Sequence, residues 1–311
     1  MGSERQEKQM ANDERDFNAL LAELGADESA KGSEEAEIEV PTGPPARVIA
    51  VLNQKGGCGK TTTAVNLACG LARGMGNGKR RVLLVDLDPQ AASTIALLGV
   101  EAADGPQKAP MVYELLLGTV GIRDIIQQLE LPGKKGAAKG TLDILPSHQL
   151  ASGVELELFT QEFNREGRLI AGLKPVLHSY DFIVIDCPPS LNMLSFNALA
   201  AATEVLIPVD PGVFPLTGLR RLVEVVGKAR RINSELDILG VVPTRQRKTV
   251  LSDSTEEKLR DKFGDRVMTG IPERTAISEA HAAQQDIFSW KPTGPGARAY
   301  GRLAMEVVRR G

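Results

Sequence analysis

Short apolar segments recur along the chain from residue 47 onward, and segments with helical periodicity lie between most of them. The apolar segments predict strands near residues 47–53, 81–86, 142–145, 181–186, 203–209, 237–243 and 267–271. Strands that alternate with helices are typical of parallel βαβ units. We therefore expect a single α/β domain over residues 47–311, with a mainly parallel, doubly wound sheet.

The first 46 residues have a different composition. They contain twelve acidic and four basic residues, a formal charge of −8, so residues 47–311 carry +5 and the overall charge of −3 hides this asymmetry. Low hydrophobicity with many Glu, Gly, Ser and Pro residues predicts a short, acidic and mostly disordered arm. Within it Phe17, Leu20, Leu21 and Leu24 share one helical stripe, which predicts either a docking helix for a partner or a helix that covers the domain's own surface.

A glycine-rich loop, Asn53 to Thr62, joins the first predicted strand to a predicted helix over residues 61–73. Glycines allow backbone N–H groups to surround a phosphate chain, and the helix N-terminus adds partial positive charge. The expected nucleotide contacts are Lys55, Gly56, Gly57, Cys58, Gly59, Lys60, Thr61 and Thr62. Lys60 is expected to reach the β and γ phosphates, and the Thr61 hydroxyl to bind Mg²⁺. The strand and helix context argues against a chance glycine-rich turn.

This loop carries two lysines, whereas most phosphate-binding loops carry one. The usual spacing asks for a glycine at position 54, which is Gln54 here, and Lys55 follows it. A lysine at the start of the loop points away from its own phosphates in most geometries. Lys55 is therefore expected to reach the nucleotide of a second subunit, which makes the chain a dimer when nucleotide is bound.

Three aspartates follow predicted strands. Asp86 and Asp88 end one apolar segment, and Asp186 ends another. Ligands of α/β sheets bind outside the carboxyl ends of the strands, so these side chains are expected to converge on the phosphates and the metal. One is needed for Mg²⁺ and one for the attacking water, and the pattern alone does not rank Asp88 above Asp86. A solvated turn or a helix cap is the alternative for any single aspartate.

Four segments together resemble the deviant Walker motifs and late signature of the ParA/Soj partition ATPases. They are Lys55–Thr61, Val85–Gln90, Ile185–Ser190 and Ile271–Ala280, and Leu145–His148, Pro208–Pro211 and Gly296–Tyr300 also fall in register. The resemblance runs from about Arg47 to Arg310. It implies the fold of a P-loop NTPase with ATP and Mg²⁺ as cofactors.

The resemblance also implies roles for single residues. Lys55 crosses the dimer interface to the partner's nucleotide, while Lys60 serves its own. Asp88 activates water and Asp86 and Asp186 support the metal, so the implied catalytic residues are Lys55, Lys60 and Asp88. Pro272 and its neighbours are implied adenine contacts. Family members form ATP-dependent dimers on nonspecific DNA and are released when a ParB-type partner stimulates hydrolysis.

Basic residues are concentrated between residues 220 and 248, where eight bases stand against three acids. Such a patch would neutralise DNA phosphates without reading bases, so binding would be independent of sequence and sensitive to salt. The expected DNA contacts are Lys228, Arg230, Arg231, Arg245, Arg247 and Lys248. A solvated helix face with a charged loop is the alternative. The basic segment Lys134–Lys139 is interpreted as a flexible loop because of its glycine content.

Nothing in the sequence predicts a membrane contact. No apolar run reaches about 18 residues, no signal peptide is present, and the last predicted helix, residues 297–310, has apolar positions suited to packing on the domain. The three cysteines lack the spacing of a zinc site or a disulfide framework, which favours a reducing cytoplasm, and the family resemblance adds association with the nucleoid. Cys58 is interpreted as a small loop residue rather than a redox sensor.

The function expected from these features is that of an ATP-dependent, dimerising DNA-binding switch for plasmid or chromosome partition. Turnover is expected to be slow until a ParB-type partner stimulates it. One alternative is a related ATPase that positions a protein cargo over the nucleoid. A dethiobiotin-synthetase-like metabolic ligase and a nucleotide-binding protein without hydrolysis are the other two.

Overall fold

The computed structural model describes residues 43–76, 78–103, 110–131, 140–148, 157, 158, 160, 165–211 and 216–310. The chain divides into two units, Met1–Pro41 and Thr42–Gly311, and all described residues belong to the second. The helical stripe predicted in the acidic arm and the basic segment Lys134–Lys139 lie outside the described residues.

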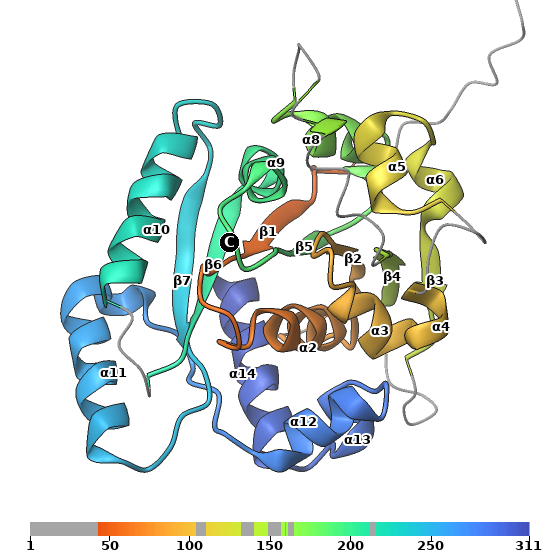
Figure 1. Ribbon diagram of the computed structural model, residues 1–311. Coiled ribbons are helices and arrows are strands. Elements are labelled where there is room, and N and C mark those ends of the chain that lie inside the picture. The colour runs from red at the N-terminus through yellow and green to blue at the C-terminus, as the bar shows by residue number, and fades with distance from the viewer. Residues whose placement is uncertain are drawn as a thin grey trace, which may run out of the picture. The chain divides into compact units, whose positions relative to one another are not determined.

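A seven-stranded sheet forms the centre of the second unit, in the order β3-β4-β2-β5-β1-β6-β7 (Figure 1). Only β3 runs antiparallel, against β4, and every other neighbouring pair is parallel. The strands are β1 (Arg47–Val51), β2 (Arg81–Asp86), β3 (Gln127–Leu129), β4 (Thr141–Leu145), β5 (Phe182–Asp186), β6 (Glu204–Val209) and β7 (Asp237–Pro243). The prediction of a mainly parallel sheet in one α/β domain is confirmed.

The predicted strand at residues 267–271 is wrong. This segment contacts β7 irregularly: besides the isolated bridge between Val241 and Val267, its N–H donors to β7 are Met268, to the Val241 carbonyl at 2.9 Å, and Ile271, to the Pro243 carbonyl at 2.7 Å, three residues apart where a ladder needs two. Between them the N–H of Thr269 donates to the Glu306 carboxylate at 2.9 Å, so no regular ladder forms. Conversely, β3 was not predicted, because Gln127–Leu129 is short, polar and largely exposed.

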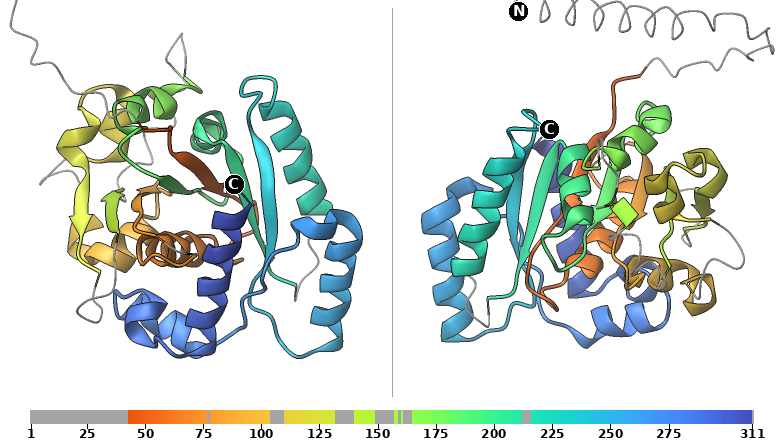
Figure 2. Two further views of the ribbon diagram at one scale, coloured as in Figure 1. Left: turned by 180° about the vertical axis from the view of Figure 1, so that it is seen from behind. Right: turned by 45° about the horizontal axis from the view of Figure 1, so that its top comes forward.

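Helices cover both faces of the sheet because the strand side chains are apolar on both sides (Figure 2). Val48 and Ala50 of β1 join one core, and Ile49 and Val51 join the other. The helices are α2 (Lys60–Ala72), α3 (Ala92–Leu98), α4 (Val100–Ala103), α5 (Val112–Leu117), α6 (Ile122–Ile125), α8 (Arg168–Leu173), α9 (Met193–Ala201), α10 (Leu216–Ala229), α11 (Val250–Phe263), α12 (Thr275–Ala282), α13 (Ile287–Trp290) and α14 (Pro295–Arg309), with short 3₁₀ helices at Lys174–Val176 and Gly264–Arg266.

The C-terminal helix α14 packs against α2, which follows the glycine-rich loop (Figure 2). Leu303 and Val307 of α14 are fully buried in the core that also contains Leu67 and Leu71 of α2. The last helix therefore supports the first helix of the domain, as its apolar positions predict. Among the described residues, no helix has the length and apolar character needed to cross a membrane.

Candidate active site

The glycine-rich loop between β1 and α2 has the backbone of an anion site. Gly57 and Gly59 adopt φ angles of +71° and +86°, which glycine accepts at little cost and other residues rarely adopt. Helix α2 begins at Lys60, so its first N–H groups have no partner within the helix and face the loop. The loop thus offers backbone donors and the helix dipole to a phosphate chain.

The loop is tied to the ends of two neighbouring strands. The Asn53 side chain accepts from Lys55 N–H at 3.1 Å and donates to the Pro208 carbonyl of β6 at 2.6 Å. The Thr244 hydroxyl, just after β7, donates to the Cys58 carbonyl at 2.7 Å. Cys58 itself is fully buried, and burial raises the pKa of its thiol. The bond from Thr244 uses the Cys58 carbonyl and not its thiol, so the buried side chain fills space in the loop.

The two loop lysines occupy different environments. Lys60 is nearly buried, and its ammonium lies 3.3 Å from the Lys55 carbonyl and lines the cavity described below. The Lys55 side chain is 35% exposed, and its ammonium lies 3.9 Å from the Asp210 carboxylate. Lys55 is not among the described residues that line the cavity. That Lys55 serves a second subunit stays a prediction.

Asp86 and Asp186 lie side by side at the ends of β2 and β5, where they are register partners. Both are fully buried. Burial raises the pKa of both carboxyls, and their mutual charge raises the pKa of Asp186 further. Asp88 also has a raised pKa because of burial, opposed by a hydrogen bond from Gln90 N–H and by the charge of Lys60. Two adjacent buried carboxyls are costly without a cation to compensate them.

Hydrogen bonds distinguish the two buried carboxyls. Both oxygens of Asp86 have donors, since Oδ2 accepts from the N–H and the hydroxyl of Thr94 at 2.7 Å each and Oδ1 accepts from Asp88 N–H at 3.2 Å. Asp186 Oδ2 accepts from the Ser93 hydroxyl at 2.8 Å, but its Oδ1 is buried and has no hydrogen-bond partner among the described residues.

The free oxygen of Asp186 fits a hard cation such as Mg²⁺, which prefers oxygen ligands. The Thr61 hydroxyl is close enough to Asp186 to lower the pKa of that carboxyl. Thr61 and Asp186 are thus the described residues that could hold such a cation at the start of α2, and this role stays a prediction. Both oxygens of Asp86 already accept from Thr94 and Asp88, so Asp86 has less capacity for a metal than Asp186.

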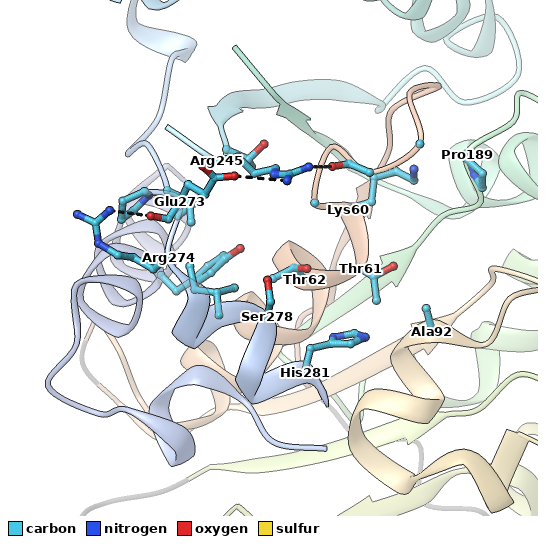
Figure 3. A pocket seen from close by; sticks show the side chains of 18 of the residues that line it. Lys60, Thr61, Thr62, Ala92, Pro189, Arg245, Glu273, Arg274, Ser278 and His281 are labelled. Carbon is cyan, nitrogen blue, oxygen red and sulfur yellow. Dashed lines mark hydrogen bonds and ion pairs between the residues drawn. The ribbon is translucent and has the colours of Figure 1, made fainter. Parts of the chain in front are cut away.

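A cavity of about 530 Å³ opens beside the loop. One end is lined by Gly56, Gly57, Gly59, Lys60, Thr61, Thr62 and Asp88, and the other by residues of the α12 region, α14 and the segment after β7, among them Arg245, Pro272, Glu273, Ser278, His281 and Tyr300. Figure 3 shows Thr62, Ser278 and His281 directed toward this space. Burial lowers the pKa of His281, which favours the neutral form of its imidazole. Pro272 lines the cavity, and its contact with adenine stays a prediction.

Arg245, predicted as a DNA contact, also lines this cavity (Figure 3). It adopts a left-handed φ of +51°, and its guanidinium donates to the Gly57 carbonyl at 3.2 Å and pairs with Glu273 at 3.4 Å. Arg247 pairs with the same carboxylate, with a second bond at 2.8 Å. Arg245 therefore connects the glycine-rich loop to the other wall of the cavity.

Apart from Arg245, the five other predicted DNA contacts form two groups rather than one patch. Lys228, Arg230 and Arg231 precede β7, whereas Arg247 and Lys248 follow it. A strand of seven residues separates the groups by about 20 Å. Arg230 also pairs with Asp237 and donates to the Leu236 carbonyl at 2.7 Å. The spacing in the sequence did not reveal this separation.

Sequence reasoning missed several polar residues that hold the site together. They are Asn53, Ser93, Thr94, Ser147, Asp210 and Thr244, all in loops or helix starts at the carboxyl ends of strands or directly after them. Their position could have indicated them, because binding residues gather at the carboxyl ends of the strands in a parallel sheet. Their hydroxyl and amide groups are too common to be singled out by type.

Comparison with known proteins identifies relatives over most of the chain. An AAA domain family model matches residues 46–238. The sporulation initiation inhibitor protein Soj of Bacillus subtilis is 40% identical over 268 residues, which cover 85% of this chain and 99% of Soj. The chromosome partitioning protein ParA of Caulobacter vibrioides is 38% identical over 271 residues, covering 86% of this chain and 95% of ParA.

A solved structure extends the likeness to three dimensions. Cobyrinic acid a,c-diamide synthase from Mycobacterium smegmatis, with a bound ATP analogue and magnesium, matches with a TM-score of 0.68 and 30% identity. The match covers 85% of this chain and 95% of that chain. This fold thus occurs in a protein whose structure contains a bound ATP analogue and magnesium.

Proposed function

The chain belongs to the ParA/Soj family of P-loop ATPases, and on this premise we propose that it is an ATP-dependent dimerising switch for DNA partition, with Mg·ATP as its nucleotide. The observation that carries the proposal is the convergence of the glycine-rich loop, Lys60 and Asp88 on one cavity, with Asp186 and its free oxygen next to Thr61 of the lining. The partition role is supported by the likeness to ParA of Caulobacter vibrioides, a chromosome partitioning protein.

In this proposal the loop N–H groups and the Lys60 ammonium hold the phosphates. Thr61 and Asp186 hold Mg²⁺, which neutralises phosphate charge, and Asp86 keeps the neighbouring backbone in place. Pro272 and its neighbours enclose the base at the far end of the cavity. These roles follow from the position of each group relative to the helix N-terminus.

Asp88 is proposed to orient the attacking water and accept its proton. Its carboxyl is 6% exposed, lines the cavity and has a pKa raised by burial, which makes it a better base than a solvated aspartate. Water attacks the γ phosphorus, the bond to the β-γ bridging oxygen breaks, and ADP and phosphate leave. Lys60 lowers the energy of the charge that develops on the phosphate oxygens.

Dimerisation and DNA binding complete the proposed switch. Lys55, partly exposed and outside the lining of its own cavity, reaches the nucleotide of a second subunit. The dimer then presents Lys228, Arg231, Arg247 and Lys248 of both subunits to nonspecific DNA, which places the protein on the nucleoid. These side chains are exposed. Arg230 is also exposed and lies next to Arg231, so it belongs to the same group as Lys228 and Arg231. A ParB-type partner stimulates hydrolysis and releases the dimer.

Two alternative functions remain: one has a different cargo, and the other a different reaction. A protein cargo positioned over the nucleoid would use the same site, so only the partner distinguishes it. A metabolic ligase is favoured by one observation, the 30% identity to cobyrinic acid a,c-diamide synthase. Soj and the chromosome partitioning protein ParA have higher identities, 40% and 38%, and the likeness to ParA supports the switch.

The decisive experiment is DNA binding with ATP, with ADP, and with ATP on Lys55→Ala, measured from low to high salt. Lys174→Ala is the matched control, because Lys174 is exposed and belongs to a 3₁₀ helix far along the chain from the loop. We expect ATP-dependent binding that weakens steeply with salt and is lost only in Lys55→Ala. Absence of DNA binding in every nucleotide state would overturn the partition role and favour the ligase.

A further inference from the structure

The segment after β4 runs beside the loop that carries Asp88. Strands β2 and β4 are parallel neighbours, so the residues that follow them meet at the same edge of the sheet. Ser147, two residues beyond β4, is fully buried there. Its N–H donates to the Thr94 hydroxyl oxygen at 2.9 Å, and its own hydroxyl donates to the Asp88 carbonyl at 3.0 Å.

These bonds connect Ser147 to both acids of the loop after β2. The Thr94 hydroxyl that accepts from Ser147 donates in turn to the Asp86 carboxylate at 2.7 Å. Ser147 therefore holds Asp86 through Thr94 and holds Asp88 directly through its backbone carbonyl. No atom of the Asp88 carboxylate is used in this contact, which leaves that group to face the cavity.

The loop that Ser147 braces has an unfavourable backbone conformation. Ala91 adopts φ +51° and ψ 35°, the left-handed region that costs a non-glycine residue of order 1 kcal/mol. The Asp88 carbonyl accepts from Ala91 N–H at 2.8 Å, so this carbonyl is the common acceptor of the strained turn and of Ser147. A turn of this kind persists only when surrounding contacts hold it.

Tyr113 and His148 enclose the Ser147 hydroxyl from the other side. The Tyr113 hydroxyl lies 3.1 Å from Ser147 Oγ, and the Tyr113 ring meets the His148 ring edge-on with centroids 5.4 Å apart. His148 is 4% exposed and contacts the Glu114 carboxylate at 3.3 Å. The bond from Ser147 to Asp88 is thus shielded from water, where hydrogen bonds are stronger.

We propose that Ser147 is a positioning residue for ATP hydrolysis, which fixes the backbone of Asp88 so that its carboxylate meets the attacking water. The inference rests on the proposed role of Asp88. Among the described residues Ser147 does not itself line the cavity, and its hydrogen bonds reach one lining residue, Asp88, through the backbone carbonyl, so its effect is expected on the chemical step. Tyr113 acts with it by holding the Ser147 hydroxyl in its orientation.

The test is steady-state ATP hydrolysis and separate ATP-binding measurements on Ser147→Ala. We expect kcat to fall about tenfold, the effect of one buried hydrogen bond, while ATP affinity and KM stay within about twofold. Ser147→Thr keeps the hydroxyl and is expected to restore at least half of the lost kcat. Thr255→Ala is the control, because it removes another buried hydroxyl bond, 2.9 Å to Leu251 within α11, far from the loop.

A purely structural role for Ser147 would lower the melting temperature and leave kcat of the folded enzyme unchanged, and that result overturns the proposal. If Ser147→Ala does not fold, Tyr113→Phe decides, since it keeps the ring and removes only the hydroxyl. It is expected to lower kcat about threefold at unchanged KM, and an unchanged kcat again overturns the proposal. Asp88→Asn is measured in parallel. If this variant retains full kcat, the proposed role of Asp88 in hydrolysis is overturned, whatever the effect of the Ser147 substitution.

Discussion

At the scale of single residues, the site separates two carboxyls that look alike in the sequence. Asp86 has a donor for each oxygen, whereas Asp186 has one buried oxygen without a partner among the described residues. We expect Asp186→Asn to raise the Mg²⁺ concentration needed for half-maximal hydrolysis at least tenfold. Because it removes one of two adjacent buried charges, metal-free Asp186→Asn is expected to melt at the same or a higher temperature.

Asp86→Asn provides the contrast for that prediction. Its amide group would face either the Thr94 donors or the Asp88 N–H, so one donor loses its acceptor. The expected cost is about 1–3 kcal/mol in the free energy of unfolding, measured by urea denaturation. Equal Mg²⁺ dependence in the two variants would contradict the assignment of Asp186 as the metal-facing carboxylate.

Arg245 and Arg247 offer a second test at this scale, because both pair with Glu273 but only Arg245 reaches the glycine-rich loop. Arg245→Ala is expected to weaken ATP binding about three- to tenfold, since it removes the link between Gly57 and the opposite wall of the cavity. Arg247→Ala is the matched control and is expected to leave ATP affinity unchanged. Titration with a fluorescent ATP analogue measures both. A larger loss in Arg247→Ala would return Arg245 to the DNA-contact group.

At the scale of elements, the apolar segments ending in motifs were predictable because each strand is buried on both faces. β1, β2 and β5 are continuous apolar runs that stop at the glycine-rich loop or at an aspartate. The segment 267–271 is apolar at Val267, Met268 and Ile271, but its N–H bonds to β7 are irregularly spaced and Thr269 between them bonds to Glu306, which lies 37 residues away. A partner so distant leaves no local pattern. The sequence likewise predicted one basic patch where the structure has a group on either side of β7. A count of charges along the sequence does not show that the strand between them holds the two groups apart.

The support that α14 gives to α2 leads to a prediction for the elements. Leu303 of α14 is fully buried in the core it shares with α2, whereas Met305 on the same helix is 36% exposed. Leu303→Ala is expected to lower the free energy of unfolding by about 2–5 kcal/mol, and Met305→Ala by less than about 1 kcal/mol. Urea denaturation measures both values. If Leu303→Ala costs no more than Met305→Ala, the helix does not contribute to the core that supports the loop.

At the scale of the whole molecule, charge is divided unevenly between the two parts of the chain. Residues 1–46 carry −8 and residues 47–311 carry +5. A tethered negative segment repels DNA phosphates and competes for the same basic groups by long-range electrostatics, an effect that salt screens over about 10 Å at 0.1 M. The sequence left open whether the arm acts through its charge or through the apolar stripe at Phe17 to Leu24.

Two full-length variants separate these possibilities. Replacing Glu34, Glu35, Glu37 and Glu39 by Gln removes half of the net charge of the arm and keeps the apolar stripe. We expect it to strengthen ATP-dependent DNA binding about three- to tenfold at low salt, with a difference that shrinks as salt rises. Phe17→Ser with Leu20→Ser keeps the charge and is expected to leave the affinity unchanged. The opposite pattern, a response to the apolar change alone, would mean that the arm acts as a docking helix, because packing and not charge would then control access to DNA.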